Sequence, residues 1–205
     1  MKLSVILVSF LVAFISLNQS FAEVYTTGSA TDNNDNIIVI GYCLGNVAIG
    51  GEQFNITTPS AFILKLNSDG DKIWVRFINS SQSIKANAVA VDNSGNIYIT
   101  GEFSGTASFD TQLLYAQNSD AFIVKLNESG NISWVKQGFS PNNARGNDIY
   151  LSNDGLVYVC GYAASIIFDS LSISGGPIEN CGYTVKISND GITHLLFQSH
   201  DNAYN

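Results

Sequence analysis

The chain has few of the residues on which catalysis and nucleic-acid binding usually depend. Its 205 residues include 2 histidines, and 9 lysines or arginines against 17 acidic residues, so the net charge is −8. No basic cluster is present to bind phosphate backbones, and we therefore exclude nucleic acid as a partner. His194 and His200 occur in no zinc spacing and no nucleophile motif, which leaves surface or strand positions as their expected role.

Long apolar runs are also missing, except at the start of the chain. Lys2 precedes a nearly unbroken apolar run, Leu3–Leu17, and the small residues Ser20 and Ala22 occupy the cleavage positions. This pattern is typical of a secretory signal peptide over residues 1–22. The run is short for a bilayer span of about 20 residues, so a retained anchor helix is the lesser alternative. We expect a secreted or extracellular protein, periplasmic or at the cell surface in some hosts, with no membrane span after cleavage.

Amphipathic helical stripes are absent after residue 22. The chain instead has short runs rich in Ile, Val, Tyr and Phe, separated by Gly, Asn, Asp and Ser, which is typical of strands and turns. Two blocks recur about every 60 residues, and the first block ends in an in-register glycine. The first block occupies residues 36–41, 96–101 and 156–161, and the second occupies residues 61–67, 121–127 and 182–188. Residues 61–76 and 121–136 are identical at 9 of 16 positions, so we interpret the chain as three copies of one structural unit.

Each unit is expected to hold four short strands. In the middle copy these are Asn87–Val91, Asn96–Phe103, Ala121–Leu126 and Ile132–Lys136. Glycine-containing turns join such strands into an antiparallel sheet, and four strands per repeat is what one propeller blade requires. We predict an all-β fold, a partial, three-blade β-propeller of four-stranded antiparallel sheets, preceded by a signal-peptide helix. Residues 23–205 then form three blades, at about 28–87, 88–147 and 148–205.

The motifs Asp92–Gly101 and Asp120–Gly130, followed by Trp134, resemble the β-propeller repeat family of secreted, mostly bacterial proteins, with seven-bladed β-propeller-type repeats. The resemblance implies a multi-bladed extracellular propeller, usually within a larger protein, and no single activity or catalytic set. The spacing from Gly130 to Trp134 is also similar to the blade signature of quinoprotein-type propellers, in which the tryptophan lies between neighbouring sheets. Leu195 replaces this tryptophan in the third copy.

Three blades form an open arc, because closed propellers typically have four to eight. The first and last sheets would each leave an apolar face uncovered, and burial stabilises a protein by about 25 cal/mol per Å² of apolar surface. Two explanations follow. Either the chain is a fragment of a longer propeller with further blades, or it closes the arc by self-association.

Two turns have the oxygen-rich composition of calcium loops. Asp69 and Asp71 flank Gly70, and Asp32 and Asp35 lie in a different turn, before the second strand. The bidentate acid that closes a calcium loop is missing, and the same residue types form tight turns. We therefore expect structural turns and no cofactor, with Ca²⁺ at these four aspartates as the weaker alternative.

The three cysteines are Cys43, Cys160 and Cys181. An odd number cannot form a complete set of intramolecular disulfides, so one thiol stays free or pairs between chains. A bridge between Cys160 and Cys181 is the favoured pairing because both belong to the third repeat. The equally favoured alternative is that the cysteines act as buried small apolar residues.

The sequence favours a non-catalytic extracellular binding or scaffold module over an enzyme. Lys65, Lys125 and Lys186 recur at one position of every copy, which indicates a structural role, since a catalytic site is normally built once. We identify no catalytic residue and expect a protein or carbohydrate partner. The alternative is an extracellular enzyme or a cofactor- or metal-binding propeller, hydrolase or quinoprotein-like.

Overall fold

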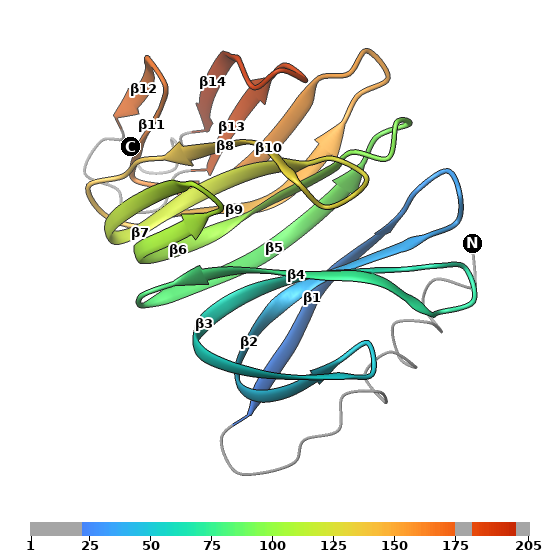
Figure 1. Cartoon of the computed structure of the whole chain (residues 1–205). Helices are drawn as coiled ribbons and strands as arrows, with labels where there is room; N and C mark the ends of the chain where they lie inside the picture. The colour runs from blue at the N-terminus through green and yellow to red at the C-terminus, as the bar shows by residue number, and fades with distance from the viewer. Residues whose placement is uncertain (1–21, 175–181, 200–205) are drawn as a thin grey trace.

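The computed structural model describes residues 22–174 and 182–199 of the chain. In these ranges the chain folds mainly into β-strands joined by turns (Figure 1). The expected all-β fold is confirmed. The expected leader helix lies outside the described residues, as do Cys181 and His200. In the described ranges we find no helix with the length and apolar character needed to cross a membrane.

Fourteen strands follow one another along the described ranges. They are β1 (Glu23–Thr31), β2 (Ile37–Ile49), β3 (Glu52–Leu66), β4 (Lys72–Ser80), β5 (Ser83–Val91), β6 (Ile97–Phe109), β7 (Gln112–Leu126), β8 (Ile132–Gly138), β9 (Ala144–Leu151), β10 (Val157–Ala163), β11 (Ser165–Phe168), β12 (Leu171–Ser174), β13 (Gly182–Ile187) and β14 (Thr193–Ser199).

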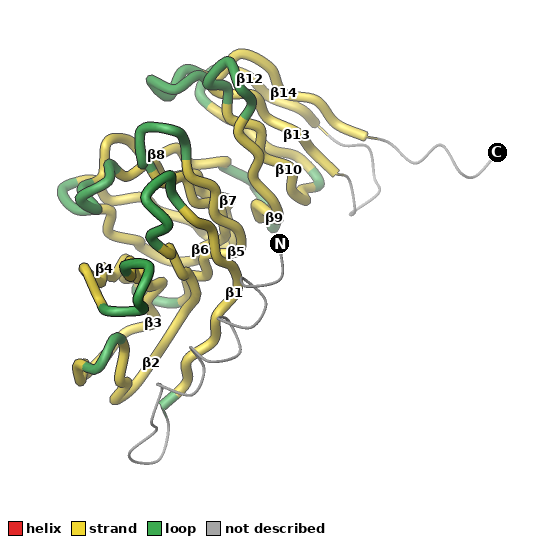
Figure 2. Tube along the Cα trace, turned by 90° about the vertical axis from the view of Figure 1, so that its right-hand side faces the viewer, coloured by secondary structure: helices red, strands yellow, loops and turns green. Residues whose placement is uncertain are grey.

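The strands form three antiparallel units, which confirms the predicted partial propeller. Blade 1 comprises β1 to β4, blade 2 comprises β5 to β8, and blade 3 comprises β9, β10, β13 and β14. The first strands β1, β5 and β9 lie side by side in this order (Figures 1 and 2). Each blade therefore presents its first strand to the next blade's first strand and its fourth strand to the outside.

The second and third strands are longer than the sequence indicates. In blade 2 the second strand does not end at Phe103 as predicted. The pairing shifts register between Phe103 and Gly105, and the second strand then stays paired with the third strand as far as the pair of Phe109 and Gln112. Gly105 has a φ of 72°, which a glycine adopts without strain, so the glycine bends the strand without ending it. We call the resulting hairpin extensions arms. They comprise residues 45–56 in blade 1, 105–116 in blade 2, and β11 with β12 in blade 3.

Strand β5 shows how the blades share their cores. Its alternate residues Val89 and Val91 pack against the apolar cluster between blades 1 and 2, whereas Ala88 and Ala90 pack against the cluster between blades 2 and 3. A strand with an apolar cluster on each face needs an unbroken apolar run, as the sequence predicts. The pleat of β5 therefore determines which residue contacts which neighbour.

The in-register glycine of each second strand is required by close packing. A Cβ on Gly101 would lie 1.9 Å from the main-chain oxygen of Lys85 and 2.8 Å from the ring of Phe122. Gly41 and Gly161 are equally crowded by a first-strand oxygen and by the ring of Phe62 or Tyr183. Each blade thus places an aromatic ring from its third strand over the glycine, and no larger residue fits there.

Candidate ligand-binding surface

Asp32, one of the calcium candidates, is a buried turn residue. Its Oδ1 accepts main-chain N–H groups from Asn34 and Asn36, and its Oδ2 lies 3.0 Å from Nζ of Lys65. Both charged side chains are almost fully buried, at 2% and 3% exposure. Burial opposes ionisation of Asp32, but the hydrogen bonds from Asn36 and Lys65 prevail and lower its pKa. The carboxylate is already engaged with its own turn and with Lys65.

Of the other calcium candidates, Asp35 lies in the same turn as Asp32, whereas Asp69 and Asp71 lie in another. Asp69 and Asp71 donate their N–H groups to Oδ1 of Asn67, at 3.0 and 2.8 Å, and so lie in a second turn. Asp35 adopts a φ of 57° in the first turn. Within residues 22–174 and 182–199, no three acidic, histidine or cysteine side chains converge on one point. Calcium binding stays a prediction that the structure leaves untested.

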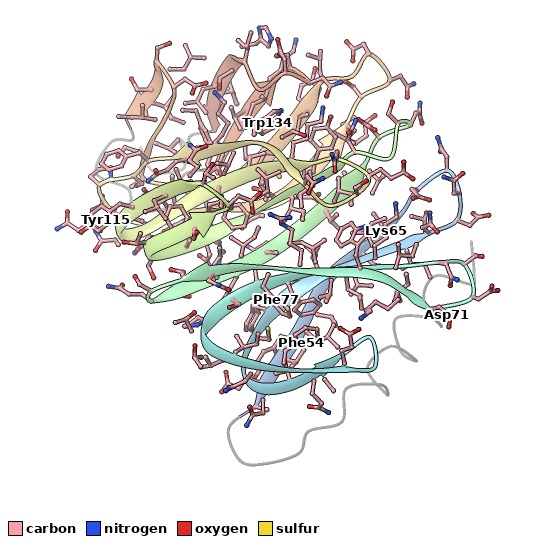
Figure 3. The ribbon with its side chains drawn as sticks, viewed as in Figure 1. Phe54, Lys65, Asp71, Phe77, Tyr115 and Trp134 are labelled. Atoms are coloured by element: carbon pink, nitrogen blue, oxygen red, sulfur yellow. The ribbon has the colours of Figure 1, made fainter. Side chains whose placement is uncertain are left out.

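The recurring lysines and tryptophans tie each blade to the next. Lys65 lies between blades 1 and 2, and its Nζ is 3.7 Å from Oε1 of Glu128 in blade 2 (Figure 3). Tyr115, by contrast, takes no part in this joint and projects outward from the arm of blade 2 (Figure 3). Lys125 donates to the main-chain oxygen of Asn189 at 3.2 Å, and Trp134 donates to the same oxygen at 3.0 Å. These residues recur because the joint between blades recurs.

The described cysteines differ in their surroundings. Cys43 is buried, at 2% exposure, and burial raises the pKa of its thiol to about 12. Cys160 is exposed, and neither thiol forms a disulfide with another described residue. The favoured bridge between Cys160 and Cys181 is untested because Cys181 lies outside the described residues. His194 is exposed on β14.

Two further equivalent positions do not hold the same residue in all three blades. Tyr25, Lys85 and Arg145 occupy one position of the first strands, and Tyr42, Glu102 and Tyr162 follow the crowded glycines of the second strands. In each blade the two positions are directly paired across the ladder. We call these six residues the variable surface.

The variable surface is continuous across the three blades. The rings of Tyr25 and Tyr42 stack with their centroids 4.8 Å apart. Nζ of Lys85 lies 5.3 Å from the ring centre of Tyr42, so it links blade 2 to blade 1. In blade 3 the guanidinium of Arg145 lies 5.6 Å from the ring centre of Tyr162. Such cation–π contacts stabilise a structure by about 0.5–1 kcal/mol each at exposed sites. They keep the cationic side chain and the aromatic ring together at the surface.

A cavity of about 330 Å³ opens between blades 2 and 3 within this surface. It is lined by Glu102, Asn143, Ala144, Arg145 and Tyr162. The cavity therefore combines a carboxylate, a guanidinium, an amide and an aromatic ring. These groups bind polar and aromatic ligands by hydrogen bonds, ion pairs and stacking.

The connector between blades 2 and 3, which carries Asn143, is hydrogen-bonded to a buried acid of blade 2. Asp120, 1% exposed, accepts the N–H of Ser140 at 2.9 Å and the side-chain amide of Gln137 at 2.5 Å. Asn118 donates to the main-chain oxygen of Pro141 at 3.0 Å. Burial raises the pKa of Asp120 despite these hydrogen bonds. Blade 2 thus positions one wall of the cavity.

The sequence contains a signal for the variable surface, although the recurring motifs do not include it. Recurrence identifies residues needed by the joint between blades. The position after the identical glycine instead holds tyrosine in blades 1 and 3 (Tyr42 and Tyr162) and glutamate in blade 2 (Glu102). A change of residue type next to a repeated glycine indicates a position whose side chain the fold does not require. What the sequence does not show is that the six positions lie side by side, because this depends on how the blades stack.

Comparisons with known proteins agree with this architecture. Residues 73–102, which extend from β4 into β6, match the family model described as Beta-propeller repeat. The chain is also similar to the uncharacterized WD repeat-containing protein L264 of Acanthamoeba polyphaga mimivirus, with 24% identity over 155 residues. That alignment covers 70% of this chain and 10% of the viral protein, so the chain spans about a tenth of the relative's length. The repeat match and the relative agree with the partial propeller that the sheets of the structure form.

Proposed function

We propose that the chain is a non-catalytic, extracellular interaction module that binds a polypeptide through the variable surface. The observation that carries the proposal is the contrast between two kinds of equivalent position. Lysines that recur in every copy, such as Lys125, join the blades, whereas positions whose residue is not the same in all three blades form one continuous aromatic and charged surface. Propellers commonly use such surfaces for recognition because the sheets hold the side chains rigidly.

The chemistry of the surface favours a polypeptide ligand. Tyrosine and arginine are the side chains most often found at the energetic centres of protein interfaces. Arg145 can bind a carboxylate with two parallel hydrogen bonds, while Tyr162 and Tyr42 offer flat apolar faces to aromatic or aliphatic groups. We therefore expect a peptide segment that carries an acidic residue beside an apolar one.

Three residues supply the test of this proposal. The purified exported chain is used to select ligands from a random peptide display library, and the enriched peptides are measured against variants. Arg145→Ala and Tyr162→Ala should each weaken binding about tenfold or more, as expected for interface centres. Tyr150→Ala is the matched control, since Tyr150 is 64% exposed on the same strand as Arg145 but lies outside the variable surface.

Two results would contradict the assignment. One is the absence of any peptide enriched above background, together with ligands found only on a glycan array. The other is a set of peptides whose binding is as strong to Arg145→Ala as to Tyr150→Ala.

The extracellular location is supported by the boundary between leader and fold. The predicted cleavage after Ala22 would leave Glu23 as the first residue, and Glu23 is also the first residue of β1. Cleavage there would remove no strand residue. Expression with export should give a chain whose N-terminal residue is Glu23, determined by sequencing or intact mass. A chain that retains Met1 and stays in the cytoplasmic fraction would refute this part of the proposal.

A further inference from the structure

The fourth strand of blade 2 leaves part of the third strand without a neighbour. Strand β8 pairs with β7 along residues 121–126, but Phe139, directly after β8, exchanges two main-chain hydrogen bonds with Ile167 of β11 instead, at 2.9 and 3.0 Å. The connector meets β7 again at Ser119, through an isolated bridge. Among the residues that the structure describes, none pairs with residues 112–117 of β7 on the side opposite β6. We call residues 112–117 the open edge.

The main-chain groups of the open edge point toward its unpaired side. Tyr115 is paired with Thr106 of β6, but Thr106 donates its N–H to the hydroxyl of Ser81 and accepts the N–H of Ser81, at 2.9 Å each. In an antiparallel ladder, paired residues direct these groups either toward each other or both away. Those of Tyr115 therefore point away from β6, and its C=O accepts the side-chain amide of Gln137 at 2.7 Å. Leu113, two residues along, has the same orientation.

The open edge thus offers two donors and an acceptor to a ligand. Within residues 22–174 and 182–199, no residue bonds the N–H or the C=O of Leu113, or the N–H of Tyr115. Such groups recur at every second residue, a rise of about 6.8 Å along a strand. A second extended chain presents its own N–H and C=O groups with the same repeat, so the spacing matches another polypeptide main chain.

The open edge also lacks the features that usually keep an edge strand from pairing. Charged residues and proline are the common ones, and residues 112–119 contain neither. The equivalent stretch of blade 1, which is residues 52–59, contains both, as Glu52 and Pro59. The arm of blade 2 is therefore less protected against an added strand than the arm of blade 1.

The side chains of the open edge differ from those of the other arms. Leu113 and Tyr115 lie on one face of β7 and are 67% and 66% exposed, with Tyr115 directed outward (Figure 3). Register places Gln53 and Asn55 at these positions in blade 1, and Ser172 at the first of them in blade 3. The fold therefore accepts polar residues there, and the packing of the arm does not require the apolar pair. Exposed neighbouring apolar side chains of this kind are typical of an interaction site.

We propose that the open edge binds an extended segment of a partner polypeptide, which adds to β7 as a further strand. The main-chain groups of Leu113 and Tyr115 hydrogen-bond the segment, and their side chains contact apolar residues at alternate positions of it. The side chain of Gln137 moves aside to free the C=O of Tyr115. The unpaired main-chain groups favour a polypeptide over a glycan or a lipid surface. This site is separate from the variable surface, none of whose six residues lies on β7.

A random peptide display library selected on the purified, unaltered chain supplies the probes for a test. One class of enriched peptides should lose about tenfold or more in affinity for Leu113→Gln combined with Tyr115→Asn, which gives this arm the residues of blade 1. Tyr115→Pro should cause a similar loss, because proline removes an N–H that points away from β6. Asn55→Pro makes the same change on the arm of blade 1 and should leave the affinity unchanged. Circular dichroism should show the same strand content in all of these variants.

Methylation of the peptide main chain gives a signature specific to strand addition. N-methylation of every second amide, those that face β7, should abolish binding, whereas methylation of the intermediate amides should have little effect. The test does not depend on the variable surface, because peptides bound there lose affinity for Arg145→Ala and keep it for the β7 variants. The proposal fails if no enriched peptide is sensitive to the changes at Leu113 and Tyr115, if Asn55→Pro weakens binding equally, or if the methylation pattern lacks the two-residue period.

Discussion

The indole N–H of Trp134 donates to the main-chain oxygen of Asn189 in the following blade, 3.0 Å away. A Cβ on Gly191, two residues further along the same turn, would lie 3.2 Å from the indole ring. Trp74 makes the same contact one blade earlier, with Glu128 at 3.3 Å and Gly130 beneath the ring. The repeated glycine-to-tryptophan spacing therefore describes two sides of successive joints, with each tryptophan lying on the next blade's turn.

Removing Trp134 should weaken the joint between blades 2 and 3. Trp134→Ala is expected to lower the free energy of unfolding by about 3 kcal/mol, because it removes a large ring that packs against the shared core. Trp134→Phe keeps most of the ring and should lose about 1 kcal/mol with the hydrogen bond. Urea unfolding measures both. Tyr115→Ala, at a residue 66% exposed, should change stability by less than about 0.5 kcal/mol, and an equal loss there would contradict the packing argument.

The crowded glycines should tolerate no side chain. Gly101→Ala places a Cβ 1.9 Å from the main-chain oxygen of Lys85 and should cost at least about 3 kcal/mol, because backbone must move. Gly155→Ala is the comparison, since Gly155 has a φ of 81° with open space around it. It should cost only about 1–2 kcal/mol of left-handed backbone strain. Thermal or urea unfolding that ranks the two variants in the reverse order would refute the packing role.

The buried pair of Lys65 and Asp32 should make the fold sensitive to acid. The pKa of Asp32 is lowered in the folded chain, so its ionised form contributes stability above the ordinary pKa of an aspartate, near 4, and this contribution is lost as the pH falls further. Lys65→Met should cost about 3 kcal/mol near neutral pH, because it leaves the buried carboxylate unpaired. Asp32→Asn should reduce the loss of stability measured between about pH 5 and pH 2. An unchanged acid-unfolding profile in Asp32→Asn would count against the pair.

Asp120 should have the opposite effect to Asp32 on how the stability of the fold changes with pH. Burial raises its pKa, so the folded chain binds the proton more tightly than the unfolded chain does, and ionisation of Asp120 lowers stability as the pH rises above about 4. Asp120→Asn keeps an acceptor for Ser140 and removes the charge. Its stability relative to the unaltered chain should therefore improve from pH 3 to pH 7, measured by urea unfolding at each pH. A relative stability that falls over this range would show that the charged form is the one required.

Several features of the fold are predictable from the sequence because they repeat. The apolar run Ala88–Val91 indicates a strand between two cores, and the structure confirms this for β5. The recurrence of Trp74 and Trp134 likewise indicates a contact between sheets, which is what the structure shows. The arms are harder to predict, since Gly105 is a turn signal in a sequence but a bend within a continuous ladder in the structure.

The amino-acid order specifies the strands, the turns and the spacing between copies, because alternation of side chains and glycine placement act over a few residues. It also specifies which positions recur and which vary. The variable surface from Tyr25 to Tyr162, the burial of Asp120 and the pairing of Arg76 with Asp110 arise only when the blades stack. The physical reason is distance along the chain: contacts between equivalent residues some 60 positions apart depend on how the sheets pack against one another, and no local pattern encodes that packing.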